Sequence, residues 1–239
     1  MKNKIASIMT ILIAIVSLSA SSIDLRPKSL LVLGDSISTG YGLEGYPSLN
    51  VPSFCNLLAK NLKLSNVNYT NDAINGLTSK DLLELLSNQE NEKTIKSNEA
   101  ITISIGGNDI LSPMYSFISS SVNTISVNSD KSDTNKLSVY SDMISKINTE
   151  LERTEVQNQL QNGVDEFNAN FKVIIKTIKA ISPTSKVYVQ TVYNPFSGIL
   201  GFDEISKFCE KYLSQMNQTI LTTDGIIPID VHTVFNNNA

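Results

Sequence analysis

Apolar residues are grouped along the chain into short continuous runs and longer periodic stretches. A short continuous run of large apolar residues is typical of a strand that is buried on both faces of a parallel sheet. Five runs predict strands: Ser29–Leu33, Val67–Tyr69, Ala100–Ile105, Lys186–Val192 and Ile226–Val231.

The stretches between these runs carry apolar residues at helical spacing. Four of them predict helices: Val51–Leu64, Thr78–Leu86, Val164–Ile181 and Phe202–Thr219. Thr78 and Asp81 have the spacing of a capping box, which marks the start of the second helix. Alternating strands and helices predict an α/β fold, a three-layer α/β/α sandwich with a five-stranded parallel sheet and helices on both faces.

Residues 112–161, between the third strand and the long helix, are rich in Ser, Asn and Asp. Two interpretations stay open for this insertion. It is either a mobile polar segment or a helical lid over a site. Within it, Val139–Leu151 has a pattern compatible with a helix.

The first twenty residues differ from the rest. Lys2 and Lys4 precede an apolar run, Ile5–Val16, and small residues follow at Ser17, Ser19 and Ala20. This order is typical of a secretory signal peptide, so we expect residues 1–20 to be removed from an exported protein whose domain spans residues 28–239. A retained N-terminal membrane anchor is the alternative. No cysteine follows the apolar run, which argues against a lipid anchor.

The 239 residues, 41% of them hydrophobic, suffice for one globular domain, which we expect to be monomeric. Without Lys2 and Lys4 the chain has 17 basic and 23 acidic residues, a net charge of −6, which disfavours a nucleic-acid partner. One histidine and two distant cysteines make no recognisable metal site, and no cofactor is expected. Cys55 and Cys209 either form a disulfide or stay as two buried thiols.

Polar turns with glycine follow the first three predicted strands. These turns are Gly34-Asp35-Ser36, Asn75-Gly76 and Gly106-Gly107-Asn108-Asp109. Ligands of parallel sheets bind at the carboxyl ends of the strands, where neighbouring turns meet. A serine hydroxyl can attack an ester there if N–H donors stabilise the charge on the carbonyl oxygen. Ser36 is the candidate nucleophile, and the N–H groups of Ser36 and Gly76 with the Asn108 amide are the candidate donors.

Each of these residues also has a purely structural interpretation. Ser36 could be a helix cap, Gly76 a turn residue and Asn108 a loop-stabilising amide. Their occurrence in order, at three successive strand ends, favours a catalytic site over three unrelated turns.

The stretches VLGDSISTGYG, NDAINGLTS and ISIGGNDI resemble the first three sequence blocks of the GDSL, or SGNH, serine hydrolases. The segment Val189–Phe196, VQTVYNPF, is similar to the fourth-strand region of bacterial members. The resemblance implies a flavodoxin-like SGNH hydrolase fold and ester hydrolysis. It also implies Ser36 as nucleophile and an oxyanion hole of Ser36, Gly76 and Asn108. The Gly-x-Ser-x-Gly elbow of another hydrolase fold is absent, since Ser38 stands where its second glycine would be.

The family's last block, Asp-x-x-His, supplies its general base. Here His232 is preceded at three residues by Ile229 and at two by Asp230, which gives Asp-x-His instead. We expect the domain to be truncated before its catalytic histidine and His232 to be a loop or strand-end residue after the fifth strand. The alternative is that His232 is the base, because a two-residue offset on a strand points Asp230 and His232 to the same face.

Two functions follow from these observations. The first is an exported serine esterase or lipase acting on a small lipid, acyl or acetylated-sugar ester. The second is a catalytically impaired fragment, or a non-catalytic module that binds carbohydrate or another ligand on the same fold. A nucleotide-binding domain is disfavoured because the chain has neither glycine-rich phosphate-binding motif.

Overall fold

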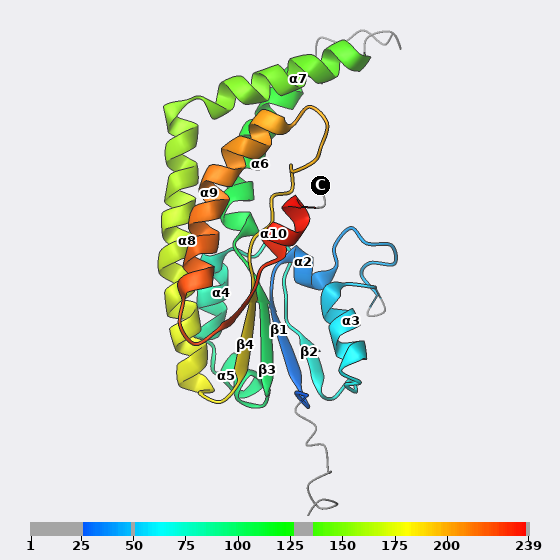
Figure 1. Cartoon of the computed structure of the whole chain (residues 1–239), viewed down its shortest axis with the longest axis vertical. Coiled ribbons are helices and arrows are strands. Elements are labelled where there is room, and N and C mark those ends of the chain that lie inside the picture. The colour runs from blue at the N-terminus through cyan, green and yellow to red at the C-terminus, as the bar shows by residue number, and fades with distance from the viewer. Residues whose placement is uncertain (1–25, 49–50, 127–135, 238–239) are drawn as a thin grey trace, which may run out of the picture.

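The computed structural model describes residues 26–48, 51–126 and 136–237, and it confirms the predicted five-stranded parallel sheet. The strands are β1 (Leu30–Gly34), β2 (Tyr69–Asn71), β3 (Ala100–Ser104), β4 (Lys186–Gln190) and β5 (Ile227–Ile229). They lie in the order β2-β1-β3-β4-β5, and each neighbouring pair is parallel (Figure 1). Because β1 lies between β2 and β3, the carboxyl ends of these three strands are adjacent.

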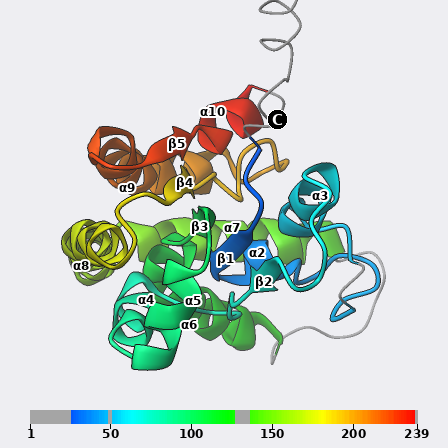
Figure 2. The ribbon, with the colours of Figure 1, turned by 90° about the horizontal axis from the view of Figure 1, so that it is seen from below.

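Helices cover both faces of the sheet. They are α2 (Ser36–Thr39), α3 (Phe54–Asn61), α4 (Ser79–Leu86), α5 (Gln89–Lys96), α6 (Gly107–Ser126), α7 (Lys136–Leu151), α8 (Thr154–Ile181), α9 (Asp203–Thr222) and α10 (Val231–Asn236). Figure 2 shows α4, α5, α8 and α9 on one face and α3 on the other. Successive strand residues point to opposite faces. Leu31 therefore belongs to the larger core cluster, whereas Leu30 packs with α3 in the smaller one.

Most of the predicted insertion is helical where the structure describes it. α6 continues to Ser126, α7 spans Lys136–Leu151, and α8 begins at Thr154. The helical pattern of Val139–Leu151 is thus confirmed, while residues 127–135 lie outside the described residues. α6 and α7 extend beyond the carboxyl edge of the sheet (Figure 1). A role for them as a lid stays a prediction.

Several elements differ from the prediction, and three of these differences have a clear physical reason. β2 begins at Tyr69 because Val67, 89% exposed, lies in the preceding turn. α5 was not expected from the sequence, since Ile95 is its only buried residue. α8 begins ten residues before Val164 because the buried side chains of Val156 and Leu160 extend its apolar stripe.

The predicted capping box of α4 is present. The Asp81 N–H donates to Thr78 Oγ1 at 3.2 Å, and the Thr78 N–H donates to Asp81 Oδ2 at 2.9 Å. These two bonds satisfy backbone donors that the first turn of a helix would otherwise leave free.

Cys55 and Cys209 are free thiols on opposite faces of the sheet. Cys55 packs with α3 in the smaller core cluster, and Cys209 packs from α9 in the larger one. Of the two alternatives, the buried thiols are correct and the disulfide is excluded. Burial raises the pKa of each thiol to about 12.

The signal peptide expected at residues 1–20 lies outside the described residues. In the part of the chain that the structure describes, no helix is both long and apolar enough to span a membrane.

Candidate active site

The turn after β1 places Ser36 at the carboxyl edge of the sheet. Gly34 has φ +133°, and a Cβ added there would lie 2.1 Å from the Ser104 carbonyl oxygen of β3. Only glycine therefore allows β1 to approach β3 so closely at this point. The next residue, Asp35, donates its N–H to the same oxygen at 3.0 Å. The chain then turns directly into the short helix α2.

Asp35, not Ser36, is the cap of α2. Its Oδ1 accepts the Ile37 N–H at 3.0 Å, and Ser36 is the first residue of the helix. The interpretation of Ser36 as a cap is therefore wrong. The half-buried Ser36 lines a pocket, and neither its hydroxyl nor its N–H forms a hydrogen bond within the described residues. Both groups are available to a ligand.

The turn after β2 is held by side chains from the end of α2 and from the loop that follows α2. Thr39 Oγ1 donates to Asn75 Oδ1 at 2.6 Å, and Asn75 Nδ2 donates to the Tyr46 hydroxyl at 2.7 Å. The adjacent Gly76 has φ +80°, a conformation that L-residues rarely adopt. A Cβ there would meet nothing within 4 Å, and the Gly76 N–H has no acceptor among the described residues. Gly76 thus presents a free backbone donor to open space.

The turn after β3 is bonded to the turn after β2. Asn108, in the first turn of α6, donates from Nδ2 to the Leu77 carbonyl oxygen at 2.9 Å. Leu77 directly follows Gly76, so this bond fixes the Asn108 amide next to the Gly76 turn. An amide nitrogen carries two hydrogens, and the second remains free to donate.

The three predicted turns therefore meet. Ser36 and Asn108 line one pocket, and the Gly76 turn is bonded to Asn108 through the neighbouring residue. Together they offer one hydroxyl, two free backbone N–H groups and one side-chain amide. This donor set can stabilise an oxygen that becomes negatively charged during acyl transfer.

The carboxylates of the buried Asp35 and the half-buried Asp109 support the turns. Asp35 is 3% exposed, and burial raises its pKa from 3.8 to about 6 against the lowering effect of the Ile37 N–H. The negative charge of Asp109 raises it further. Burial likewise raises the pKa of Asp109 to about 6, and its carboxylate accepts the N–H and hydroxyl of Ser79 at the start of α4. Asp109 thereby joins α6 to α4 beneath the Gly76 turn.

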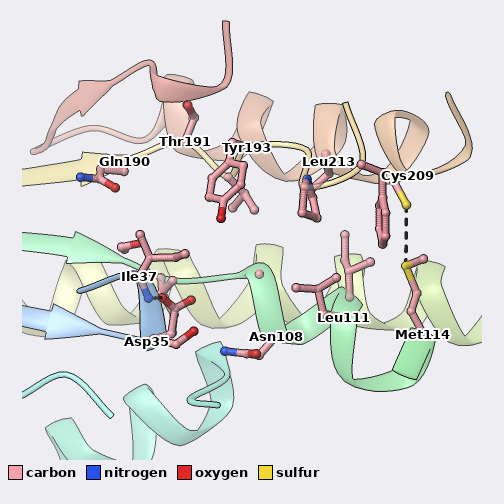
Figure 3. A pocket seen from close by; sticks show the side chains of 18 residues that line it. Asp35, Ile37, Asn108, Leu111, Met114, Gln190, Thr191, Tyr193, Cys209 and Leu213 are labelled. Atoms are coloured by element: carbon pink, nitrogen blue, oxygen red, sulfur yellow. Dashed lines mark hydrogen bonds between the residues drawn. The ribbon is translucent and has the colours of Figure 1, made fainter. Parts of the chain in front are cut away.

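The pocket extends from Ser36 between α6 and α9. Its empty volume is about 690 Å³, including solvent at its mouth. One wall is the last residue of β4, Gln190, with the segment that follows it as far as Phe196, and the opposite wall is the first two turns of α6. In Figure 3, Tyr193 projects from the first wall toward Ile37 and Asp35. Burial raises the pKa of Tyr193, and the charges of Asp35 and then Tyr115 raise it further.

The sequence matches a known family over nearly the whole of the described domain. A model of the GDSL-like Lipase/Acylhydrolase family matches residues 32–239. The chain belongs to this family. Its match covers all three turns of the site, as well as the segment after β4 that forms the pocket wall. No curated protein matches the chain.

Solved structures of hydrolases share the fold of this GDSL-family chain. The lipase Lip_vut3 from a goat rumen metagenome is 20% identical, with a TM-score of 0.57, over 87% of this chain and 82% of that chain. Phospholipase A1 from Streptomyces albidoflavus NA297 is 16% identical, with a TM-score of 0.53, and the match covers 87% of this chain and 81% of that chain. The extracellular lipase from Streptomyces rimosus is 18% identical, with a TM-score of 0.51, and the match covers 87% of this chain and 82% of that chain.

His232 is bonded away from Ser36. It lies in the first turn of α10, whereas a loop or strand-end position was expected. Its Nδ1 is 3.1 Å from the Val192 carbonyl oxygen, and its Nε2 is 2.8 Å from Glu210 Oε1 on α9. Asn236 Nδ2 also lies 3.1 Å from Nε2. Both ring nitrogens therefore have partners other than the serine.

Asp230 does not orient the His232 ring. It caps α10, where its Oδ1 accepts the Thr233 N–H at 3.1 Å and the Thr191 hydroxyl at 3.2 Å. The Thr233 hydrogen bonds are the main reason why the pKa of Asp230 is lowered. Because α10 is a helix, the same-face argument, which assumed a strand, does not apply.

Sequence reasoning missed the apolar part of the pocket. Leu111 and Met114 of α6 and Cys209 and Leu213 of α9 line it, although Met114 and Cys209 lie 95 residues apart in the sequence. The helical spacing of these apolar residues is the one sequence signal for this part of the pocket, and the same spacing also predicts ordinary core packing. Among the described residues, no group of three or more His, Cys, Asp and Glu side chains could hold a metal ion.

Proposed function

We propose that this GDSL-family protein hydrolyses carboxylic esters and that Ser36 is its nucleophile. One observation carries the proposal: the free Ser36 hydroxyl lines a pocket at the strand edge where two free N–H groups and the Asn108 amide meet. A structural turn has no need of this combination. The family membership supports the same reaction class.

In the proposed reaction, Ser36 Oγ attacks the ester carbonyl carbon and loses its proton. The carbonyl oxygen becomes negatively charged and accepts hydrogen bonds from the N–H groups of Ser36 and Gly76 and from Asn108 Nδ2. The bond to the alcohol oxygen then breaks, and this oxygen takes up the proton that Ser36 Oγ lost, so the alcohol leaves and the acyl group stays on Ser36. Water hydrolyses this acyl-enzyme and regenerates the serine.

A fluorophosphonate probe tests the nucleophile, because it phosphonylates activated serines. We expect labelling of the wild-type protein at Ser36, none in Ser36→Ala, and retained labelling in Ser38→Ala. Ser38 is a suitable control because it is two residues away in the same helix but fully buried. An unlabelled wild-type protein, or equal labelling of Ser36→Ala, would contradict the proposal.

A second candidate function is ligand binding without catalysis. It is favoured by the partners of His232, which leave Ser36 Oγ without a bonded base in the described residues. A serine hydroxyl without a base is a weak nucleophile. Calorimetric binding of an ester or a carbohydrate, with no hydrolysis over hours, would support this function over the first.

We also propose that the protein is exported, acts on a small ester and is monomeric. The support for export is the order of Lys2, Lys4 and the apolar run Ile5–Val16. Mass spectrometry of the exported protein should give a new N-terminus between Ser19 and Ser22. Recovery of only the Met1 form in the membrane fraction would favour an anchor instead. Sedimentation velocity tests the monomer.

A further inference from the structure

The pocket changes character along its length. At the Ser36 end it is lined by polar groups, including Asp35 and Asn108. In Figure 3 these lie at one end, Leu111 and Leu213 follow, and Met114 and Cys209 lie at the other end. Asp35 is the one charged side chain among the described residues that line the pocket. The inner part is therefore suited to an apolar group, and a charged or hydroxyl-rich group would lose its water there without compensation.

Two sulfur atoms are in contact at the end of the pocket away from Asp35. Cys209 Sγ of α9 lies 3.7 Å from Met114 Sδ of α6, so the two helices touch at this point. The side chains are buried, with exposed fractions of 2% for Cys209 and 1% for Met114. Both residues line the pocket, and Figure 3 shows them at the end of its lining away from Asp35.

We propose that the pocket binds the acyl chain of the substrate and that the Met114–Cys209 contact limits the length of that chain. The inference rests on the proposed ester hydrolysis and names its substrate class: esters of unbranched fatty acids rather than acetylated sugars. Cys209 is then a specificity-determining residue. It has no reactive role, because burial raises the pKa of its thiol to about 12 and keeps it protonated.

The proposal predicts a particular dependence on chain length. Each methylene that enters the apolar part should raise kcat/KM about fourfold, the equivalent of burying one CH₂. The increase should stop abruptly at the length that reaches the sulfur contact. A surface groove without a closed end would give a gradual plateau instead.

Two substitutions move the closed end in opposite directions. Cys209→Leu fills it, so the preferred p-nitrophenyl ester should become shorter and the kcat/KM ratio of long to short esters should fall about tenfold or more. Met114→Ala opens it, so the preferred ester should become longer. Cys55→Leu is the matched control, since it enlarges a buried cysteine outside the pocket and should leave the profile unchanged. Unchanged profiles in both pocket variants would overturn the proposal.

Thiol modification tests the same site without catalysis. Methyl methanethiosulfonate, used in large excess at alkaline pH because only a small fraction of each buried thiol is ionised, should reach Cys209 through the pocket, and decanoate should slow this reaction while acetate should not. Cys55 is the internal control, because it is equally buried but on the other face, so it reports only global opening. Equal rates at Cys209 and Cys55, or no protection by decanoate, would overturn the inference.

Failure of the proposed catalysis and failure of the acyl-pocket proposal would give different results. Protection of Cys209 by decanoate in a protein that neither hydrolyses esters nor labels at Ser36 would support the acyl pocket and refute the proposed catalysis. Hydrolysis with a flat chain-length profile and no protection would support the catalysis and refute the acyl pocket.

Discussion

The buried charge of Asp35 should make the protein less stable as the pH rises from 4 to 7. Asp35 is buried at the Ser36 turn, where it caps α2 through the Ile37 N–H. We consider the substitution Asp35→Asn. Asparagine caps a helix about as well as aspartate does, and its side-chain oxygen can accept the same hydrogen bond. The substitution therefore removes the charge and keeps the cap.

The direction in which the stability changes with pH follows from the raised pKa of Asp35. Between pH 3.8 and about 6 the folded protein keeps the Asp35 proton while the unfolded chain loses it, so the free energy of unfolding falls across this window. Each pKa unit corresponds to about 1.4 kcal/mol. The rise from 3.8 to about 6 thus amounts to about 3 kcal/mol of lost stability at pH 7, and the loss is complete above the folded pKa.

Urea unfolding at intervals from pH 4 to pH 8 measures this effect. The stability of Asp35→Asn minus that of the wild type should increase by about 3 kcal/mol between pH 4 and pH 7. Asp81→Asn is the control, because the contribution of Asp81 to stability should depend on pH in the opposite direction. The Thr78 hydrogen bonds lower the pKa of Asp81, so its contribution is present above the unfolded pKa and is lost on acidification. Parallel pH curves for the wild type and Asp35→Asn would refute the reasoning.

Four further substitutions test the site. Gly34→Ala should lower the free energy of unfolding, measured in urea, by about 3 kcal/mol or more, because the new Cβ would meet a carbonyl oxygen. Gly76→Ala should lower it by only about 1 kcal/mol, because the new Cβ would meet nothing. Asn108→Ala should lower kcat for ester hydrolysis about 10²- to 10³-fold, and a kcat within tenfold of the wild type would exclude it as an oxyanion donor. His232→Ala should change kcat less than about tenfold, because its ring bonds Glu210; a loss of about 10⁴ would identify it as the base.

The strands and the three turns could be predicted because each depends on local sequence. In the run Ala100–Ser104, the residues Ala100, Ile101 and Ile103 are apolar, and the whole strand is buried. The Thr78 capping box involves residues three positions apart, and it forms as expected. Once the strand order is known to be β2-β1-β3, the meeting of the turns follows from the geometry of a parallel sheet.

The remaining features depend on contacts between distant segments. α5 was missed because its eight residues contain one buried side chain, so its helical pattern is nearly absent from the sequence. The partners of His232 were not predictable because Glu210 belongs to another helix and Val192 contributes only its carbonyl oxygen. A contact through a main-chain oxygen has no signature in side-chain types.

The residues next to the proposed functional groups explain why the turns would hold their shape without substrate. Asp35 caps the helix that presents Ser36, and Asn75 joins the Gly76 turn to Thr39 at the end of the same helix. Asp109, adjacent to Asn108, holds the start of α4 from below. Oxyanion donors lower a barrier only if they need no reorganisation when charge develops. The geometry of the site therefore depends on these neighbours, so Asn75→Ala should lower kcat even though Asn75 itself need not touch the substrate.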